Sequence, residues 1–198
     1  MTNLDQRACG ILCPIFSLPS KFGIGSLGKA AFDFVDYLSE AGYKYWQILP
    51  IHPPTIDNSP YTAYSAFAGN DMLLDIDELC DAGYISNDDY VNLYFGNDES
   101  RVDYDSLISS KHKVFSVLFE NFKANIPDDF SEFCEAEAQW LDSYSQFMAI
   151  HDYLEGAELV DWPHEYKRPS NQFLDDFCKQ HQDTILYYKC LQYFFFKQ

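Results

Sequence analysis

The first part of the chain alternates between short apolar runs and one amphipathic segment. Residues 10–15 are an apolar run interrupted by proline, which is typical of a buried strand, and residues 45–49 predict a second short strand that is stopped by Pro50. Between them, residues 28–41 carry apolar side chains at spacings of three and four, which predicts a helix ended by Gly42. Strand, helix and strand in this order predict a βαβ unit with parallel pairing. The apolar face of the predicted helix consists of Ala31, Phe34, Val35 and Leu38.

Two loops are predicted around this unit. Residues 16–27 contain Pro19, Gly23 and Gly25 and follow the first predicted strand. Residues 51–70 follow the second predicted strand and include three prolines. A loop of this length inside a compact domain is usually functional, and sites in parallel α/β folds gather at the carboxyl ends of strands.

Beyond a boundary near residues 70–75, the patterning is helical. Ser170 is expected to cap a last helix over residues 170–198, and this helix is still apolar where the sequence stops. One predicted face consists of Val114, Phe115, Leu118, Phe119 and Phe122, and a second of Phe133, Ala136, Trp140, Tyr144, Phe147 and Met148. The inward residues of the last helix are Phe173, Phe177, Tyr188, Leu191 and Phe195.

Charge divides the chain at the same boundary. The 198 residues carry a formal net charge of -18. Four basic and five acidic side chains give residues 1–70 a net charge of -1, which leaves -17 for residues 71–198. The hydrophobic fraction of 47% excludes intrinsic disorder. The acidity argues against nucleic acid and against an anionic membrane surface as partners, because both attract Lys and Arg.

Other sequence features predict a cytoplasmic protein without a cofactor or a metal. No run of about 18 apolar residues occurs, and residues 1–10 lack the apolar core of a signal peptide. The cysteines show no zinc-ligand spacing and are expected to be reduced thiols. None of the five histidines is assigned a catalytic role. The cysteines are Cys9, Cys13, Cys80, Cys134, Cys178 and Cys190.

Residues 23–28 match the G-x-G-x-x-G pattern of dinucleotide sites. In such a site the glycines follow the strand directly, and an acidic residue at the end of the next strand binds the ribose. Here seven residues separate Ile15 from Gly23, and Leu49-Pro50-Ile51 stands where the acidic residue is needed. We therefore interpret the glycines as a tight turn into a helix, with Ser26 or Gly28 near its cap.

Residues 58–70 cluster hydroxyls, amides and aromatic rings in the long loop. Aromatic rings stack on sugar rings, and polar groups hydrogen-bond sugar hydroxyls, so this mixture suits a neutral, hydroxyl-rich ligand. A Ser-Pro turn whose aromatic side chains pack inward explains the same residues, and the composition alone leaves both interpretations open.

Five ordered blocks between residues 7 and 79 together resemble the N-terminal signature of the 4-α-glucanotransferases, also called amylomaltases or disproportionating enzymes. Two positions depart from the family pattern, namely Ser26 where the family usually has Asp and Asp71 where Pro usually follows Gly-Asn. The blocks are Gly10-Ile11-Leu12, Ser17-Leu18-Pro19, Phe22-Gly23-Ile24-Gly25-Ser26-Leu27-Gly28, Trp46-Gln47-Ile48-Leu49-Pro50, and Ser59-Pro60-Tyr61 through Ser65-Ala66-Phe67-Ala68-Gly69-Asn70.

The resemblance implies an α/β fold, a (β/α)8 TIM barrel with a mostly helical inserted subdomain. Residues 1–79 would hold the first βαβ unit and the glucan-binding loop, 80–169 the insertion, and 170–198 the helix before the third strand. Because 198 residues are fewer than the roughly 250 of a typical barrel, we expect an incomplete barrel.

The resemblance also implies transfer of α-1,4-glucan segments between maltooligosaccharides by retaining double displacement, without a cofactor. The family's catalytic carboxylates lie on later strands, so no catalytic residue is assigned and the isolated chain is expected to be inactive. Ser59 and Tyr61 match positions that contact the bound glucan. Two alternatives remain at this point, a non-catalytic carbohydrate-binding or interaction module and, less favoured, a nucleotide-binding domain that uses residues 23–28.

Overall fold

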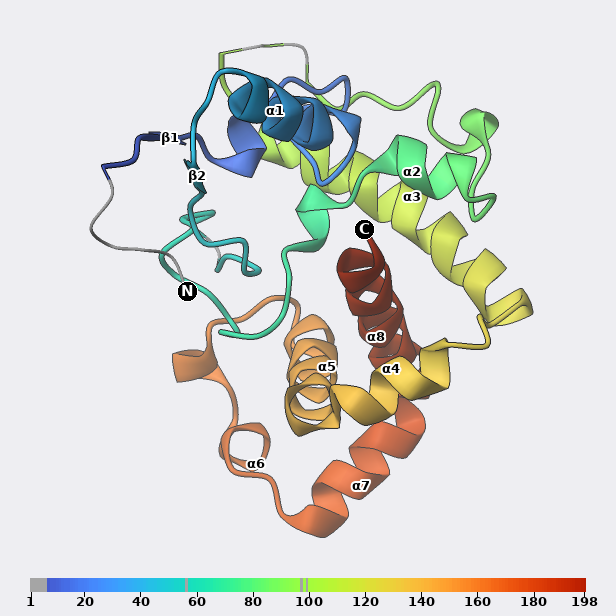
Figure 1. Ribbon diagram of the computed structural model, residues 1–198. Coiled ribbons are helices and arrows are strands. Elements are labelled where there is room, and N and C mark those ends of the chain that lie inside the picture. Colours follow the sequence, from blue (N-terminus) through green and yellow to red (C-terminus); the bar gives the residue numbers. More distant parts are fainter. Residues whose placement is uncertain (1–6, 56, 97, 99) are drawn as a thin grey trace.

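The computed structural model describes residues 7–55, 57–96, 98 and 100–198 and is mostly helical (Figure 1). Helix α8 lies in the middle of the molecule, and α3, α4, α5 and α7 pack against it. Residues 1–6 and Ile56, which belong to the predicted N-terminal segment and the predicted long loop, lie outside the described residues. The strands are β1 (Gly10–Leu12) and β2 (Tyr45–Gln47). The α-helices are α1 (Lys29–Glu40), α2 (Ile76–Asp81), α3 (Tyr104–Ala124), α4 (Phe130–Ala136), α5 (Ala138–Tyr153), α6 (His164–Lys167), α7 (Asn171–Gln180) and α8 (Gln182–Lys197). The 3-10 helices are η1 (Ile15–Ser17), η2 (Asp71–Leu73), η3 (Asn87–Asp89) and η4 (Leu159–Asp161).

The predicted βαβ unit is confirmed, with shorter strands than expected. The chain enters α1 through Gly28 and leaves it through Gly42, whose φ of +80° lies in the left-handed region that glycine tolerates. Strand β1 ends early because Pro14 begins the 3-10 helix η1. The two strands are parallel, and their register pairs Gly10 with Tyr45, Ile11 with Trp46 and Leu12 with Gln47.

The prediction that the first strand is buried is wrong, since Leu12 is 57% exposed. Tyr45 of the second strand is 54% exposed. The sheet has two strands of three residues each, and its contact with α1 is made by Trp46 against the edge of the Phe34 ring. Val35, which the spacing placed on the inward face of this helix, is also exposed.

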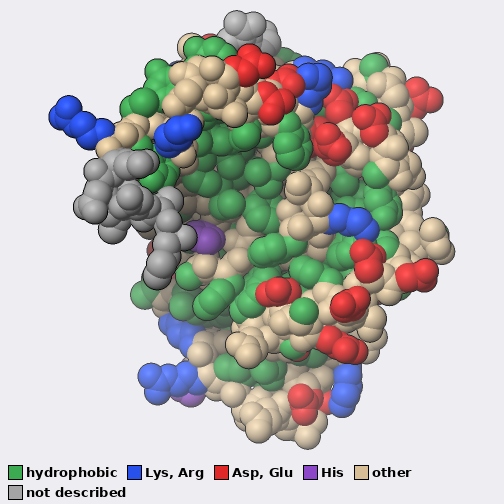
Figure 2. Space-filling model, viewed as in Figure 1, with side chains coloured by type: hydrophobic (Ala, Val, Ile, Leu, Met, Phe, Trp, Pro, Cys, Tyr) green, Lys and Arg blue, Asp and Glu red, His purple; other side chains and the backbone are tan. Residues whose placement is uncertain are grey.

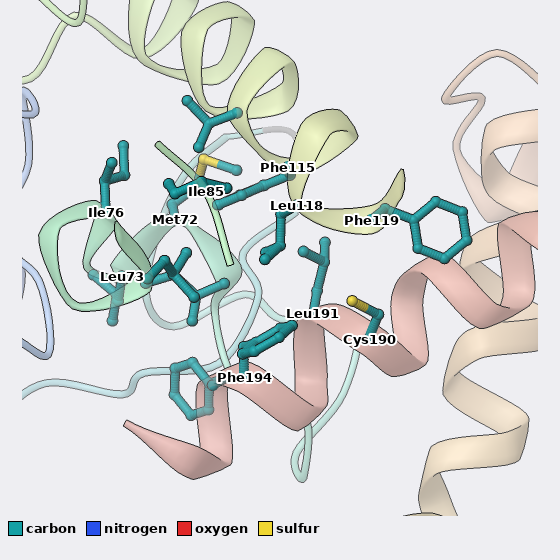
Figure 3. Packing of buried hydrophobic residues seen from close by; sticks show 14 of the residues in the cluster. Met72, Leu73, Ile76, Ile85, Phe115, Leu118, Phe119, Cys190, Leu191 and Phe194 are labelled. Carbon is teal, nitrogen blue, oxygen red and sulfur yellow. The ribbon is translucent and has the colours of Figure 1, made fainter. Parts of the chain in front are cut away.

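The main core lies instead between helices and the segment that follows the long loop. Side chains of α3 and α8 point toward one another around η2 (Figure 3). Phe115 and Phe122 of α3 and Phe194 of α8 are among the largest fully buried side chains. Complete burial of such a side chain contributes roughly 1.5–3 kcal/mol. The predicted face of α3, from Val114 to Phe122, is confirmed as buried.

Two predicted helices are each divided into two. The face predicted over residues 133–148 is interrupted at Glu137, between α4 and α5, and the last helix is interrupted at His181. At the second break, Phe177 of α7 belongs to a separate small cluster, against which Ile185 in the first turn of α8 also packs, whereas α8 from Cys190 onward belongs to the main core. The predicted cap is confirmed, since the Ser170 hydroxyl oxygen accepts the Phe173 N–H at 3.2 Å.

Hydrophobic and acidic side chains occupy different parts of the surface. Figure 2 shows hydrophobic side chains across the middle of one face and acidic side chains along its upper and right-hand border. No helix in the described ranges is long and apolar enough to cross a bilayer. Helix α2 spans the expected boundary between residues 79 and 80, so no loop marks that boundary, and the division into three parts stays a prediction.

Candidate functional site

The loop that follows β2, called the β2 loop here and comprising described residues 51–55 and 57–70, is closed at its base. The Asn70 N–H donates to the Ile51 carbonyl at 2.8 Å, which joins the two ends. Next to this bond, the His52 Nδ1 lies 3.1 Å from the Ala68 carbonyl oxygen. The loop therefore leaves and returns at one place, directly after the carboxyl end of a parallel strand.

The middle of the β2 loop folds back on itself like a short hairpin. Pro54 and Ala63 form an isolated antiparallel bridge. The Thr55 N–H donates to the Thr62 carbonyl at 3.0 Å, and the Tyr64 N–H donates to the Pro53 carbonyl at 3.2 Å. These backbone bonds give the loop a defined shape without assistance from a ligand.

Asp57 organises the tip of this loop through one carboxylate oxygen. That Oδ1 accepts the Thr62 hydroxyl at 2.6 Å, the Thr55 hydroxyl at 3.1 Å and the Ser59 N–H at 3.1 Å. The bond from Thr62, followed by that from Ser59, holds the pKa of Asp57 below its ordinary value. The sequence analysis assigned Asp57 no role, although an Asp two residues before a serine is the known signal of an Asx turn.

Ser59 and Tyr61, the two residues that the sequence analysis selected, lie on the same turn. The Ser59 hydroxyl oxygen accepts the Tyr61 N–H at 3.3 Å, and the Tyr61 side chain is 73% exposed. Asn58 precedes them with a φ of +55°, a value that Asn tolerates better than most residues. The exposed Tyr61 ring is thus held out from the loop and is accessible to a ligand.

The alternative of inward-packed aromatic side chains holds for Tyr64. Its hydroxyl lies 3.2 Å from the Nε2 of His151, and its ring contacts Phe147 with centroids 5.7 Å apart. Burial, reinforced by the charge of Glu158, raises the pKa of Tyr64, and burial lowers the pKa of His151. Tyr64 therefore anchors the loop to α5, while Tyr61 and Phe67, the latter 66% exposed, point outward.

An open groove of about 310 Å³ lies between the loop and α5. Phe67 and Trp140 both line it, and their rings form a nearly parallel pair at an interplanar angle of 17° and a centroid distance of 6.5 Å. The indole N–H of Trp140 donates to the Glu137 carboxylate at 2.5 Å. Flat aromatic rings beside the hydroxyl and amide groups of Ser143 and Gln139 suit a ligand with apolar ring faces and many hydroxyls.

The glycines of residues 23–28 pack against protein atoms and leave no cradle for a phosphate. A Cβ at Gly23 would lie 1.9 Å from the Phe95 carbonyl oxygen, and a Cβ at Gly28 would lie 2.2 Å from a carboxylate oxygen of Asp75. The same carboxylate accepts the Ser26 hydroxyl at 2.5 Å. An acidic side chain at the start of α1 disfavours a bound phosphate, and these contacts support the interpretation of a tight turn.

Among the described residues, no group of three or more His, Cys, Asp or Glu side chains is placed to hold a metal ion. All six cysteines are free thiols. The described site therefore consists of aromatic rings, hydroxyls and backbone groups on a preformed loop.

Comparison with known proteins gives the same family along nearly the whole chain. The family model described as 4-alpha-glucanotransferase, of glycoside hydrolase family 77, matches residues 13–198. The 4-alpha-glucanotransferase of Clostridium butyricum is 37% identical over 184 residues, which are 93% of this chain and 38% of the relative. The enzyme of Synechocystis is 38% identical over 199 residues, which cover 98% of this chain and 39% of the relative.

A solved structure agrees with these relatives. The amylomaltase from Streptococcus agalactiae in complex with acarbose is 37% identical and superimposes with a TM-score of 0.92, covering 97% of this chain and 39% of that one. The mostly helical chain with its two-stranded parallel sheet thus matches part of an amylomaltase structure, and it spans less than two fifths of the length of these relatives. With a family match over residues 13–198, this chain belongs to the 4-alpha-glucanotransferase family.

Proposed function

We propose that this chain forms the N-terminal part of a 4-alpha-glucanotransferase and supplies one wall of its glucan cleft. The proposal rests on one observation above all. This chain belongs to the family, and it carries an exposed aromatic ring, Tyr61, on a loop whose ends close on each other just after a parallel strand. Sites of barrel enzymes gather at that end of the strands. The relative from Streptococcus agalactiae was solved with acarbose, which supports an α-glucan as the ligand.

The proposed architecture is the first βαβ unit of a (β/α)8 barrel with a helical insertion. Residues 1–79 would hold the barrel unit and the β2 loop, 80–169 the insertion, and 170–198 the approach to a third strand. The exposed faces of β1 and β2 support this assignment, because parallel strands are normally covered on both faces by neighbouring elements.

The proposed reaction is transfer of an α-1,4-glucan segment by retaining double displacement. A carboxylate attacks the anomeric carbon while a second carboxyl group protonates the departing glucan. The hydroxyl of another glucan then displaces the enzyme carboxylate and gives its proton to the second carboxylate, which restores the acid. The two carboxyl groups of such a pair lie about 5–5.5 Å apart. We assign neither to this chain, so the 198-residue polypeptide by itself should release no glucose from maltotriose.

Within this reaction, the β2 loop binds the substrate. The Tyr61 ring would stack against a glucose ring, and the Ser59 hydroxyl would hydrogen-bond a sugar hydroxyl. Neither residue moves a proton or attacks the substrate, so their contribution belongs to binding and orientation.

Titration of acarbose into the complete gene product that contains these residues tests the proposal. We expect Tyr61→Ala to raise the acarbose dissociation constant roughly 3- to 10-fold, as loss of an aromatic contact predicts. Tyr61→Phe, which keeps the ring, should lose much less. Tyr37→Ala removes another exposed tyrosine, on α1, and serves as the matched control. Equal affinities of the wild type and Tyr61→Ala would contradict the loop assignment.

A maltotriose assay on the same gene product separates transfer from binding. Release of glucose together with longer maltooligosaccharides is the expected result. Acarbose binding without any glucose release would support the alternative of a non-catalytic carbohydrate-binding module.

A further inference from the structure

The segment that leaves the β2 loop is held by the side-chain amides of two glutamines, Gln192 on α8 and Gln198 directly after it. The Oε1 of Gln192 accepts the Gly69 N–H at 2.7 Å, and its Nε2 donates to the Gly69 carbonyl at 2.9 Å. Six residues further along both segments, Gln198 makes the same pair of bonds to Asp75, at 2.8 Å and 3.0 Å. Each amide thus satisfies both backbone groups of one residue.

The clamp at Gly69 is fully buried and closely packed. Gln192 is 1% exposed, so its amide cannot exchange these bonds for bonds to water. A Cβ at Gly69 would lie 2.0 Å from the Cδ1 of Phe195, one turn further along α8. The glycine backbone therefore rests directly against this helix, and the amide of Gln192 fixes its position there.

The clamp acts at the base of the β2 loop. Gly69 directly precedes Asn70, whose N–H closes the loop on Ile51 at 2.8 Å. It directly follows Ala68, whose carbonyl lies 3.1 Å from the His52 ring. Because the hairpin that carries Ser59 and Tyr61 extends from this base, a displacement of Gly69 moves the whole tip relative to α8.

From this geometry we infer that Gln192 is a positioning residue for glucan binding, which acts through Gly69 on the β2 loop. The inference rests on the proposed function of that loop. Gln192 touches no substrate, and it sets the place from which the Tyr61 ring meets the glucan. Gln198 makes the same bonds beyond the loop, at Asp75, and has no such role.

This pair of glutamines gives a matched experiment in the complete gene product. Gln192→Met and Gln198→Met each remove two hydrogen bonds and keep the length of the side chain. Acarbose titration and maltotriose kinetics report binding and turnover, and urea unfolding reports stability. Both variants should lose stability, Gln192→Met more than Gln198→Met, because Gln198 is only half-buried and its freed backbone partners can bond to water. Gln192→Met alone should raise the acarbose dissociation constant and the maltotriose KM, by fivefold or more and with a smaller change in kcat.

Two results would overturn the inference. One is wild-type affinity in Gln192→Met, and the other is an equal loss of affinity in both variants, which would mean that the effect is global. Should Gln192→Met fail to fold, Gln192→Asn decides, because its uncharged amide is one methylene shorter and cannot reach both Gly69 groups from the same position on α8. Wild-type acarbose affinity in Gln192→Asn would also overturn the inference. The Tyr61→Ala control separates the two proposals, since weakened binding there with normal binding in Gln192→Met rejects the role of Gln192 alone.

Discussion

Asp57 illustrates how one exposed carboxylate shapes the β2 loop. Its Oδ1 accepts hydrogen bonds from Thr55, Ser59 and Thr62. Ser59 precedes Tyr61 in the sequence and Thr62 follows it, so these bonds hold the turn on both sides of the exposed ring. Ionised carboxylates make stronger hydrogen bonds than neutral acceptors do, so the charge itself contributes to the shape of the tip. The lowered pKa of Asp57 keeps this charge in place throughout the neutral pH range.

Replacement of Asp57 tests whether the loop is preorganised. Asp57→Ala should weaken acarbose binding roughly 3- to 10-fold in the complete gene product, because the ligand must then order the loop. Its effect on the unfolding midpoint should be small. Asp89→Ala is the control, since Asp89 accepts the N–H and hydroxyl of Ser86 on η3, outside the β2 loop. Unchanged binding in Asp57→Ala would show that the tip keeps its shape without the carboxylate.

At the scale of elements, the spacing of apolar residues predicted the features that depend on residues close together in the sequence. The βαβ unit and the buried face of α3 follow from residues within a few positions of one another, and both are confirmed. The breaks at Glu137 and His181 depend on which distant cluster each half of a helix joins, so the periodicity did not reveal them. The clamp at Gly69 joins residues 123 positions apart, and a lone glutamine in an apolar helix gives no signal of it.

Lys111 links α3 to the segment after the β2 loop in a similar way. Its ammonium group is fully buried and donates to the carbonyls of Met72 at 2.7 Å and Leu74 at 2.6 Å. Burial lowers the pKa of Lys111 to about 7, although the charges of Asp71 and Asp75 act in the opposite direction. Burial also raises the pKa of Asp71, while His112 and Lys111 lower it.

The lowered pKa of Lys111 predicts a specific pH dependence of stability. Above about pH 7 the folded chain releases the Lys111 proton, whereas the unfolded chain holds it up to about pH 10.4, so the stability contributed by this group rises with pH. Between about pH 7 and pH 9, the unfolding free energy of the wild type relative to Lys111→Met should increase by roughly 1–3 kcal/mol. Urea unfolding of both proteins at several pH values measures this difference. A constant difference would show that the two carbonyls keep the ammonium charged.

At the scale of the whole molecule, burial is distributed unevenly. The cluster around α3, α8 and η2 contains many fully buried side chains, among them Leu118 and Leu191. Leu12 and Tyr45, in the two strands, are more than half exposed. The proposed binding loop therefore emerges from the sheet, the part with less buried apolar surface, and is fixed from the other side by α8 through Gln192.

This distribution predicts where the 198-residue chain opens first. Backbone amides open with free energies that follow the local burial of apolar side chains, from near zero up to the global unfolding free energy. Amides of the sheet and its edge, such as the N–H of Cys13, which follows β1 and donates to the Gln47 carbonyl at 3.0 Å, should exchange with solvent roughly 100-fold faster than those around Leu118 and Leu191. Hydrogen exchange followed by NMR at two pH values measures both sets and verifies that exchange is limited by the opening equilibrium.

Equal protection would mean that sheet and helices unfold as one unit, and Leu118→Ala would then speed exchange in β1 and α3 alike. If the sheet opens before the helices, Leu118→Ala should lower the global unfolding free energy by about 2–5 kcal/mol. It should leave exchange in β1 nearly unchanged as long as the helical core stays folded.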